Sequence, residues 1–148
     1  KMLATTAGHK YMEFSQTDAF GNVISSKDVL SAPGVKYVLI DFWASWCGPC
    51  MGEVPYLKET YSKYFEKGFQ ILGVSLDRAR DPWQKAIVDN HMNWVHVSDL
   101  KYWDNEVAKQ YGINSIPANF LVEASTGNII ATNLRGKNLE KKISELLK

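Results

Sequence analysis

The stretch VKYVLIDFW, from Val35 to Trp43, leads after two small residues into Trp46-Cys47-Gly48-Pro49-Cys50, and this region decides the fold. The first part is a continuous apolar run, which predicts a strand buried on both faces. Glycine and proline between the cysteines suit the first turn of a helix, where a proline costs no hydrogen bond. The sequence therefore predicts a buried strand, a turn and a helix that starts at the cysteine pair.

Both cysteines of the chain lie in this motif. Cys47 and Cys50 can close and open a small disulfide ring reversibly. A zinc site would need about four ligands, and His9, His91 and His96 lack ligand-like spacing to the cysteines or to each other. A purely structural disulfide in so short a loop would constrain the unfolded chain little, and the junction of strand and helix should expose the first sulfur, that of Cys47. We therefore expect redox catalysis, no metal, and no cofactor beyond the Cys47–Cys50 disulfide.

Composition limits the partners and the domain count. At 148 residues with 45% hydrophobic content, the chain fits a single domain, 1–148. A net charge of +1 with mixed signs argues against nucleic-acid binding. No apolar run approaches the roughly 18 to 20 residues of a membrane span, so we expect no stable membrane insertion. The chain opens with Lys1 and a polar run, which indicates a mature form or the C-terminal part of a longer protein.

Periodicity and turn residues predict the remaining elements. In chain order these are an N-terminal hairpin (11–17 and 23–24), a short helix to Leu30, the strand at 35–43, a helix from Cys47 to before Gly68, and a strand at 69–76. They are followed by a helix to about 90 with Asp81 as its N-cap and Pro82 as its first residue, a short strand at 94–97, a helix from Asp104 or Asn105 to Gly112, a hairpin of 118–123 and 128–133, and a last helix capped by Asn138. A βαβ half is thus followed by a ββα half.

This order and its motif resemble a known family. The segment DFWASWCGPC, from Asp41 to Cys50, closely resembles the active site of thioredoxin. The segment from Met51 to Pro55, which includes Glu53, resembles the TlpA/ResA-type thiol-disulfide oxidoreductases, as do the added hairpin and the inserted helix and strand at 82–97. The resemblance implies an α/β thioredoxin fold, a mixed central sheet flanked by helices, with an N-terminal hairpin and an inserted helix-strand.

The resemblance also implies a setting. That branch is mostly bacterial and extracytoplasmic, periplasmic or membrane-tethered, although cysteine usage alone leaves a cytoplasmic location open. The implied partners are protein thiol and disulfide substrates and an upstream electron donor, a membrane thiol reductase.

A second motif, Gly112-Ile-Asn-Ser-Ile116-Pro117, resembles the cis-proline loop of this fold. The resemblance implies that the Ile116 backbone and Pro117 receive an extended substrate strand beside Trp46, Gly48 and Pro49. The alternative is a trans proline that merely starts a strand.

The expected mechanism follows from sulfur chemistry. Cys47 at the helix start has its thiolate stabilised and is the nucleophile, and Cys50 then resolves the mixed disulfide. Asp41 and Glu53 are the two candidate proton acceptors for Cys50. Asp41 matches the buried aspartate of thioredoxin, with a solvated carboxylate at the end of a strand as the alternative.

We therefore expect a thiol-disulfide oxidoreductase that reduces protein disulfides. A disulfide oxidase or isomerase could use the same fold, but those enzymes tend to carry a histidine between the cysteines, whereas Gly48-Pro49 resembles the reducing members. A redox-sensing or partner-binding module without catalysis is the third interpretation.

Overall fold

The chain folds around a five-stranded mixed sheet. A computed structural model describes residues 6–148, and in it the strand order is β5, β4, β3, β6, β7. The strands are β3 (Tyr37–Trp43), β4 (Phe69–Ser75), β5 (Val95–Val97), β6 (Ala118–Glu123) and β7 (Ile129–Thr132). The central strand β3 pairs parallel with β4 and antiparallel with β6. The predicted mixed sheet is thus confirmed, with strand ends within about two residues of those expected.

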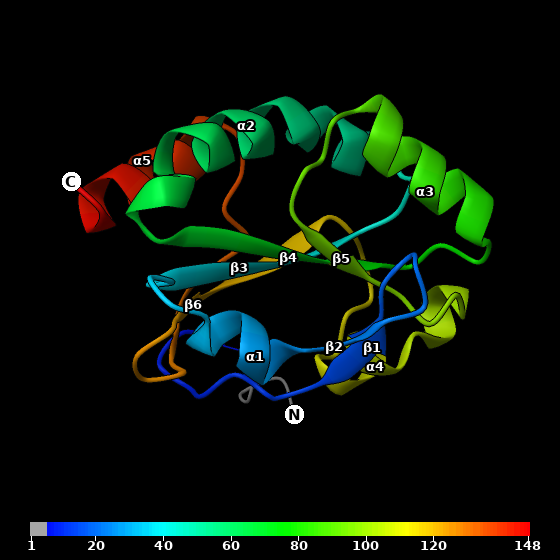
Figure 1. The fold of residues 1–148 in the computed structure, drawn as a ribbon, viewed down its shortest axis with the longest axis horizontal. Helices are drawn as coiled ribbons and strands as arrows, with labels where there is room; N and C mark the ends of the chain where they lie inside the picture. The colour runs from blue at the N-terminus through cyan, green and yellow to red at the C-terminus, as the bar shows by residue number, and fades with distance from the viewer. Residues whose placement is uncertain (1–5) are drawn as a thin grey trace.

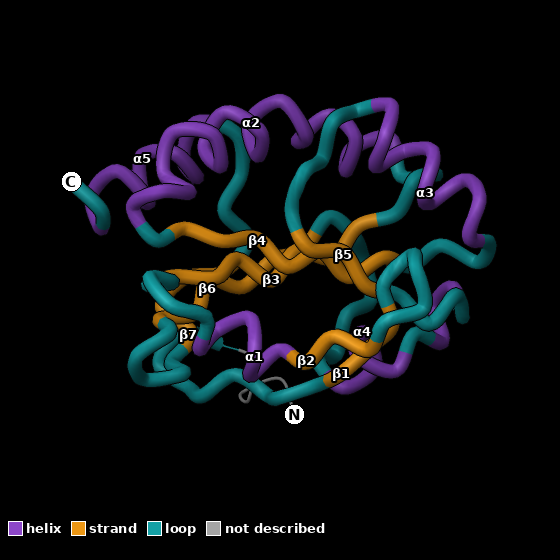
Figure 2. The backbone as a smooth tube through the Cα atoms, viewed as in Figure 1, coloured by secondary structure: helices purple, strands orange, loops and turns teal. Residues whose placement is uncertain are grey.

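Helices cover both faces of this sheet, as Figures 1 and 2 show. One face is covered by α2 (Gly48–Tyr64), α3 (Arg80–Asp89) and α5 (Lys137–Leu146). The other carries α1 (Ser26–Ser31), α4 (Glu106–Gln110) and the hairpin of β1 (Ser15–Thr17) and β2 (Val23–Ser25). Two short 3₁₀ helices, η2 (Phe65–Lys67) and η3 (Tyr102–Asp104), follow α2 and precede α4.

The two faces of β3 are assigned by its ring contacts. The Phe42 ring lies 5.5 Å from that of Tyr111, next to α4, and 6.0 Å from that of Phe120. Side chains alternate along a strand, so Asp41 and Trp43 point to the opposite face. Asp41 therefore lies on the side of the sheet that α2 covers (Figure 1).

Asn105 ties the N-terminal hairpin to the rest of the fold. Its side chain is fully buried and caps α4, accepting from the N–H groups of Val107 (2.9 Å) and Ala108 (3.0 Å). It also donates to the Ser75 carbonyl (3.2 Å) at the end of β4 and accepts from Gln16 of β1 (3.2 Å). The sequence predicted that this helix begins at Asp104 or Asn105, and in the structure Asn105 is its N-cap.

The predicted cap of α3 is wrong. The helix begins at Arg80 rather than after Asp81, so both Asp81 and Pro82 lie within its first turn. The first N–H groups of a helix have no partner inside it, so a proline is tolerated at several positions there and does not mark the cap uniquely.

The predicted cap of α5, Asn138, is also wrong. The helix starts at Lys137 with Gly136 as its N-cap, in a left-handed backbone conformation (φ 52°). The Gly136 N–H donates to the Glu53 carboxylate at 2.8 Å. A side chain from α2 thus satisfies this helix start, which no local pattern could indicate.

Candidate active site

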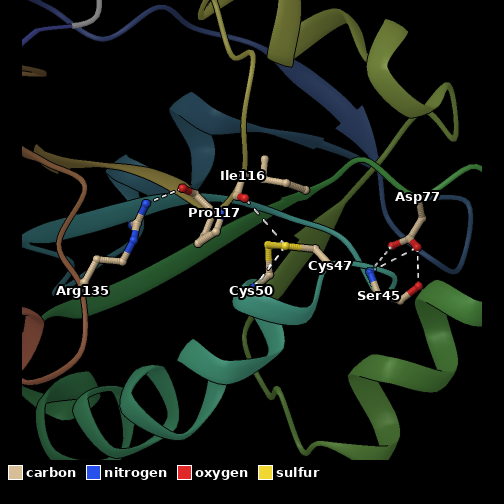
Figure 3. The surroundings of a disulfide bond; sticks show 7 residues. All are labelled: Ser45, Cys47, Cys50, Asp77, Ile116, Pro117 and Arg135. Atoms are coloured by element: carbon tan, nitrogen blue, oxygen red, sulfur yellow. Dashed lines mark hydrogen bonds between the residues drawn. A yellow bond between two sulfur atoms is a disulfide. The ribbon is translucent and has the colours of Figure 1, made fainter.

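Cys47 and Cys50 form a disulfide at the start of α2, with their Cα atoms 5.2 Å apart (Figure 3). Cys47 is the N-cap of the helix, and Pro49 lies in its first turn. The Cys50 N–H donates to Cys47 Sγ at 3.1 Å. Cys47 Sγ therefore sits where the N–H groups and dipole of the helix favour negative charge, as a thiolate would require.

The disulfide is covered rather than open. Cys47 exposes 5% of its surface and Cys50 3%, so exposure hardly distinguishes the two sulfurs, contrary to the expectation of an exposed first sulfur. The Ile116–Pro117 peptide bond is cis, and the Ile116 carbonyl oxygen lies 3.8 Å from Cys47 Sγ. The loop at 116–117 thus packs on the disulfide. Cys47 differs from Cys50 by its position at the start of α2 and not by its exposure.

The other residues expected around the substrate surround this disulfide. Trp46, Gly48 and Pro49 are exposed in the turn and first residues of α2, and Ile116 and Pro117 are half-buried on the facing loop. The structure therefore brings together both sequence motifs, which lie far apart in the chain (Figure 3).

Asp77 anchors the turn that precedes Cys47. Its buried carboxylate accepts hydrogen bonds from the Ser45 N–H (3.1 and 3.2 Å to its two oxygens) and from the Ser45 hydroxyl (Figure 3). It also accepts a hydrogen bond from the Ser75 hydroxyl (2.6 Å). The loop after β4 thus holds the turn after β3. Sequence reasoning missed Asp77, although an acidic residue directly after a predicted parallel strand was a usable signal, since ligand sites gather at this edge.

Asp41 is a buried carboxylate in the central strand, 4% exposed. Burial raises its pKa from 3.8 to about 7, while the positive charge of Arg135 lowers it and the negative charge of Glu53 raises it further. The alternative of a solvated carboxylate is therefore wrong. Asp41 can take up and release a proton near neutral pH.

Glu53 lies one helical turn beyond Cys50 and is half-buried. One of its oxygens accepts the Gly136 N–H described above. This carboxylate is thus held by the start of α5, and it stands between the cysteine pair and that helix.

Arg135 is the main charged group that sequence reasoning missed. Its guanidinium donates to the Pro117 carbonyl (Figure 3), and its Nη1 atom is buried without a hydrogen-bond partner among residues 6–148. Asn119 fixes the preceding residue, donating to the Leu134 carbonyl (3.0 Å) and accepting the Leu134 N–H (2.9 Å). Arg135 lies in a loop without a motif, so no pattern in the sequence pointed to it.

Within residues 6–148, no group of three or more His, Cys, Asp or Glu side chains is arranged to hold a metal ion. In the same range, no helix has both the length and the apolar character needed to cross a membrane.

Comparison with known proteins places this site in a family. A thioredoxin-like family model matches residues 34–129, which include both motifs. The thiol-disulfide oxidoreductase ResA of Bacillus thuringiensis subsp. konkukian is 33% identical over 146 residues, covering 95% of this chain and 76% of that protein. The chain belongs to the thioredoxin superfamily as a ResA-like member.

Solved structures agree with this assignment. The thioredoxin domain of a thiol-disulfide oxidoreductase from Bacteroides vulgatus is 35% identical, with a TM-score of 0.86 and coverage of 97% of this chain and 99% of that one. A thiol-disulfide oxidoreductase from Bacteroides fragilis is 36% identical, with a TM-score of 0.82 and coverage of 93% and 99%. This ResA-like chain is a thiol-disulfide oxidoreductase, and its family implies protein thiols as substrates.

Burial of Asp41 should make the stability of the ResA-like protein depend on pH. A folded-state pKa raised from 3.8 to about 7 means that, between these two values, the folded state keeps a proton that the unfolded state loses. The contribution of Asp41 to stability is therefore fully present below about pH 4 and is lost as the pH rises to about 7. Asp41→Asn removes this dependence. Urea unfolding of the oxidised protein measures the free energy of unfolding. The value for the variant minus that for wild type should rise by about 2 to 3 kcal/mol from about pH 5 to about pH 8.

The control is Asp28→Asn, the same change at an exposed helical position. Other titrating groups cancel because wild type and variant are compared at each pH. A difference between wild type and Asp41→Asn that stays constant with pH would show that this carboxyl is not desolvated.

Proposed function

We propose that this ResA-like protein reduces disulfides in other proteins, with Cys47 as nucleophile, Cys50 as resolving cysteine and Asp41 as the main proton acceptor. The observation that carries the proposal is the Cys50 N–H pointing at Cys47 Sγ, 3.1 Å away, at the start of α2. That N–H and the helix dipole favour a thiolate at Cys47 over one at Cys50.

The reaction starts from the dithiol. The Cys47 thiolate attacks one sulfur of the substrate disulfide, which forms a mixed disulfide and releases the other substrate sulfur as a thiolate. Cys50 then loses its proton, and its thiolate attacks Cys47 Sγ. The second substrate sulfur leaves, and two electrons have passed from the dithiol to the substrate while Cys47–Cys50 becomes the disulfide present in the structure.

The proton of Cys50 is assigned to Asp41. A general base works best when its pKa lies near the working pH, and burial brings the pKa of Asp41 to about 7. Asp41 also lies on the face of the sheet that α2 covers. Glu53 is engaged by the Gly136 N–H, so its role is to set the charge around Asp41 and to join α2 to α5.

Substrate recognition is assigned to the rim of the disulfide. The Ile116 backbone offers main-chain hydrogen bonds to an extended substrate strand, in the manner of strand addition. Pro117 packs beside it, and Trp46, Gly48 and Pro49 form the opposite side.

The wider setting is also proposed. The resemblance to the TlpA/ResA branch supports an extracytoplasmic location and recharging by a membrane thiol reductase, with a cytoplasmic location as the alternative. We further propose that the chain is a single domain, 1–148, and the C-terminal part of a longer protein. Similarity to solved domains supports this, including the C-terminal domain of a proposed thiol-disulfide oxidoreductase from Bacteroides thetaiotaomicron (38% identical, TM-score 0.85, coverage 97% of both chains).

The two cysteines should fail in different ways when each is replaced. Cys47→Ser abolishes reduction of insulin disulfides because the nucleophile is lost, whereas Cys50→Ser still attacks once and accumulates a mixed disulfide. Turbidity of reduced insulin and mass spectrometry of the trapped adduct measure the two outcomes. Adducts formed through Cys50 in the Cys47→Ser protein, and none in Cys50→Ser, would reverse the assignment.

The reduction potential separates a reductase from an oxidase or isomerase. With Gly48-Pro49 between the cysteines, we expect a value near that of thioredoxin, about −270 mV, and far from the oxidant DsbA at about −120 mV. Equilibration in glutathione redox buffers with thiol trapping gives the value. A potential above about −180 mV would place the protein with the oxidases and isomerases.

A further inference from the structure

Three aromatic side chains form an exposed surface next to the disulfide. The Trp46 ring lies 5.3 Å from that of Tyr102 and 5.9 Å from that of Trp103, and the latter two are 6.2 Å apart, centroid to centroid. Trp46 is 44% exposed and Trp103 36%. We call Trp46, Tyr102 and Trp103 the aromatic platform. Trp46 precedes Cys47, and the other two come from η3, so the platform joins segments that are distant in the chain.

The backbone that carries two of these rings is held in an unfavourable conformation. Leu100 and Tyr102 have φ values of 58° and 59°, in the left-handed region that residues other than glycine rarely adopt. The Asp99 carboxylate holds the segment by accepting from the Lys101 N–H (3.2 Å) and the Glu106 N–H (2.9 Å). The rings are thus placed before any partner arrives, which lowers the entropy cost of binding one.

The position of the platform connects it to the reaction, and this step rests on the proposed function. In the mixed disulfide the substrate sulfur is bonded to Cys47 Sγ, the residue next to Trp46. We therefore place the residues that flank the substrate cysteine near the Trp46 ring. Tyr102 and Trp103 continue that surface away from the disulfide, and exposed Trp and Tyr side chains are the types that dominate binding energy at interfaces.

The charge on the platform favours one kind of side chain. The guanidinium carbon of Arg78 lies 4.2 Å from the centroid of the Tyr102 ring. The cation position on that ring is thus already filled, and Arg78 repels a second positive charge. Aromatic and apolar side chains can still stack on the exposed rings of Trp46 and Trp103.

We propose that the aromatic platform binds an aromatic or apolar side chain close to the redox cysteine of a polypeptide substrate. In an extended chain, side chains two residues apart lie on the same face, about 7 Å from each other, so we assign the contact with the platform to the side chain two residues from the cysteine. The protein would then prefer disulfides flanked by aromatic residues and discriminate against those flanked by lysine.

The test uses three short peptides, each with one cysteine and oxidised to a symmetrical dimer, that carry Phe, Ala or Lys two residues from the cysteine. Single-turnover oxidation of the reduced protein is followed by acid quench and mass spectrometry. Wild type should react with the Phe dimer about 2- to 10-fold faster than with the Ala dimer, and slowest with the Lys dimer. Trp103→Ala should bring the Phe/Ala ratio close to one, and Trp103→Phe should keep most of it.

The ratio within one variant cancels any general loss of activity. Phe65→Ala, at another exposed aromatic residue beyond the far end of α2, should retain the wild-type ratio. A second variant, Arg78→Met, empties the cation position on Tyr102 and should raise the Lys/Ala ratio. An unchanged Phe/Ala ratio in Trp103→Ala, or a wild type that prefers the Lys dimer, would overturn the proposal.

The same experiment gives a different result if the protein is not a disulfide reductase. If the reduced wild type leaves hydroxyethyl disulfide as well as all three peptides unreduced, the reductase assignment fails. If it reduces hydroxyethyl disulfide and also reduces the three peptide dimers at the same rate as one another, only the platform proposal fails.

Discussion

Asp41 is removed from water in the central strand, and its desolvation is the constraint around which the site is arranged. A carboxylate in such a position is costly when ionised, which is why its pKa rises to about 7. The sheet register pairs it with Gly73 on one side and Asn119 on the other. Arg135 offsets part of the cost of the ionised form, and the proposed base is thereby neither permanently charged nor permanently neutral.

The same register brings four loops to one edge. The turn after β3 leads into Cys47 and is clamped by Asp77 after β4. The loop at 116–117 precedes β6 and covers the disulfide. Asn119 fixes the loop after β7, which carries Arg135 back to the Pro117 carbonyl. Each contact crosses between neighbouring strands or their loops, so the positions of both sulfurs depend on the pairing of the central strand with its two partners.

The sequence correctly predicted those features that depend only on neighbouring residues in the chain. The apolar run of β3 and the helix start at Cys47 follow from hydrophobicity and from the tolerance of the first helical turn for proline. The roles of Asp77, Arg135 and Glu53 depend on partners that lie 32, 18 and 83 positions away, and spacing carries no signal for such contacts. Trp103 shows the same limit, because nothing in the sequence marks it, while the structure leaves it exposed beside Trp46.

The central claim, that Asp41 accepts the Cys50 proton, is tested most directly by the rate at which the mixed disulfide resolves across pH. A mixed disulfide on Cys47 is formed with a small aromatic thiol, and release of that thiol is followed in wild type, Asp41→Asn and Glu53→Gln. We expect Asp41→Asn to slow release near neutral pH by on the order of 10²-fold and Glu53→Gln to shift the pH dependence with a smaller loss of rate. Unchanged release in Asp41→Asn at every pH, together with slowed release in Glu53→Gln, would contradict the assignment and make Glu53 the base.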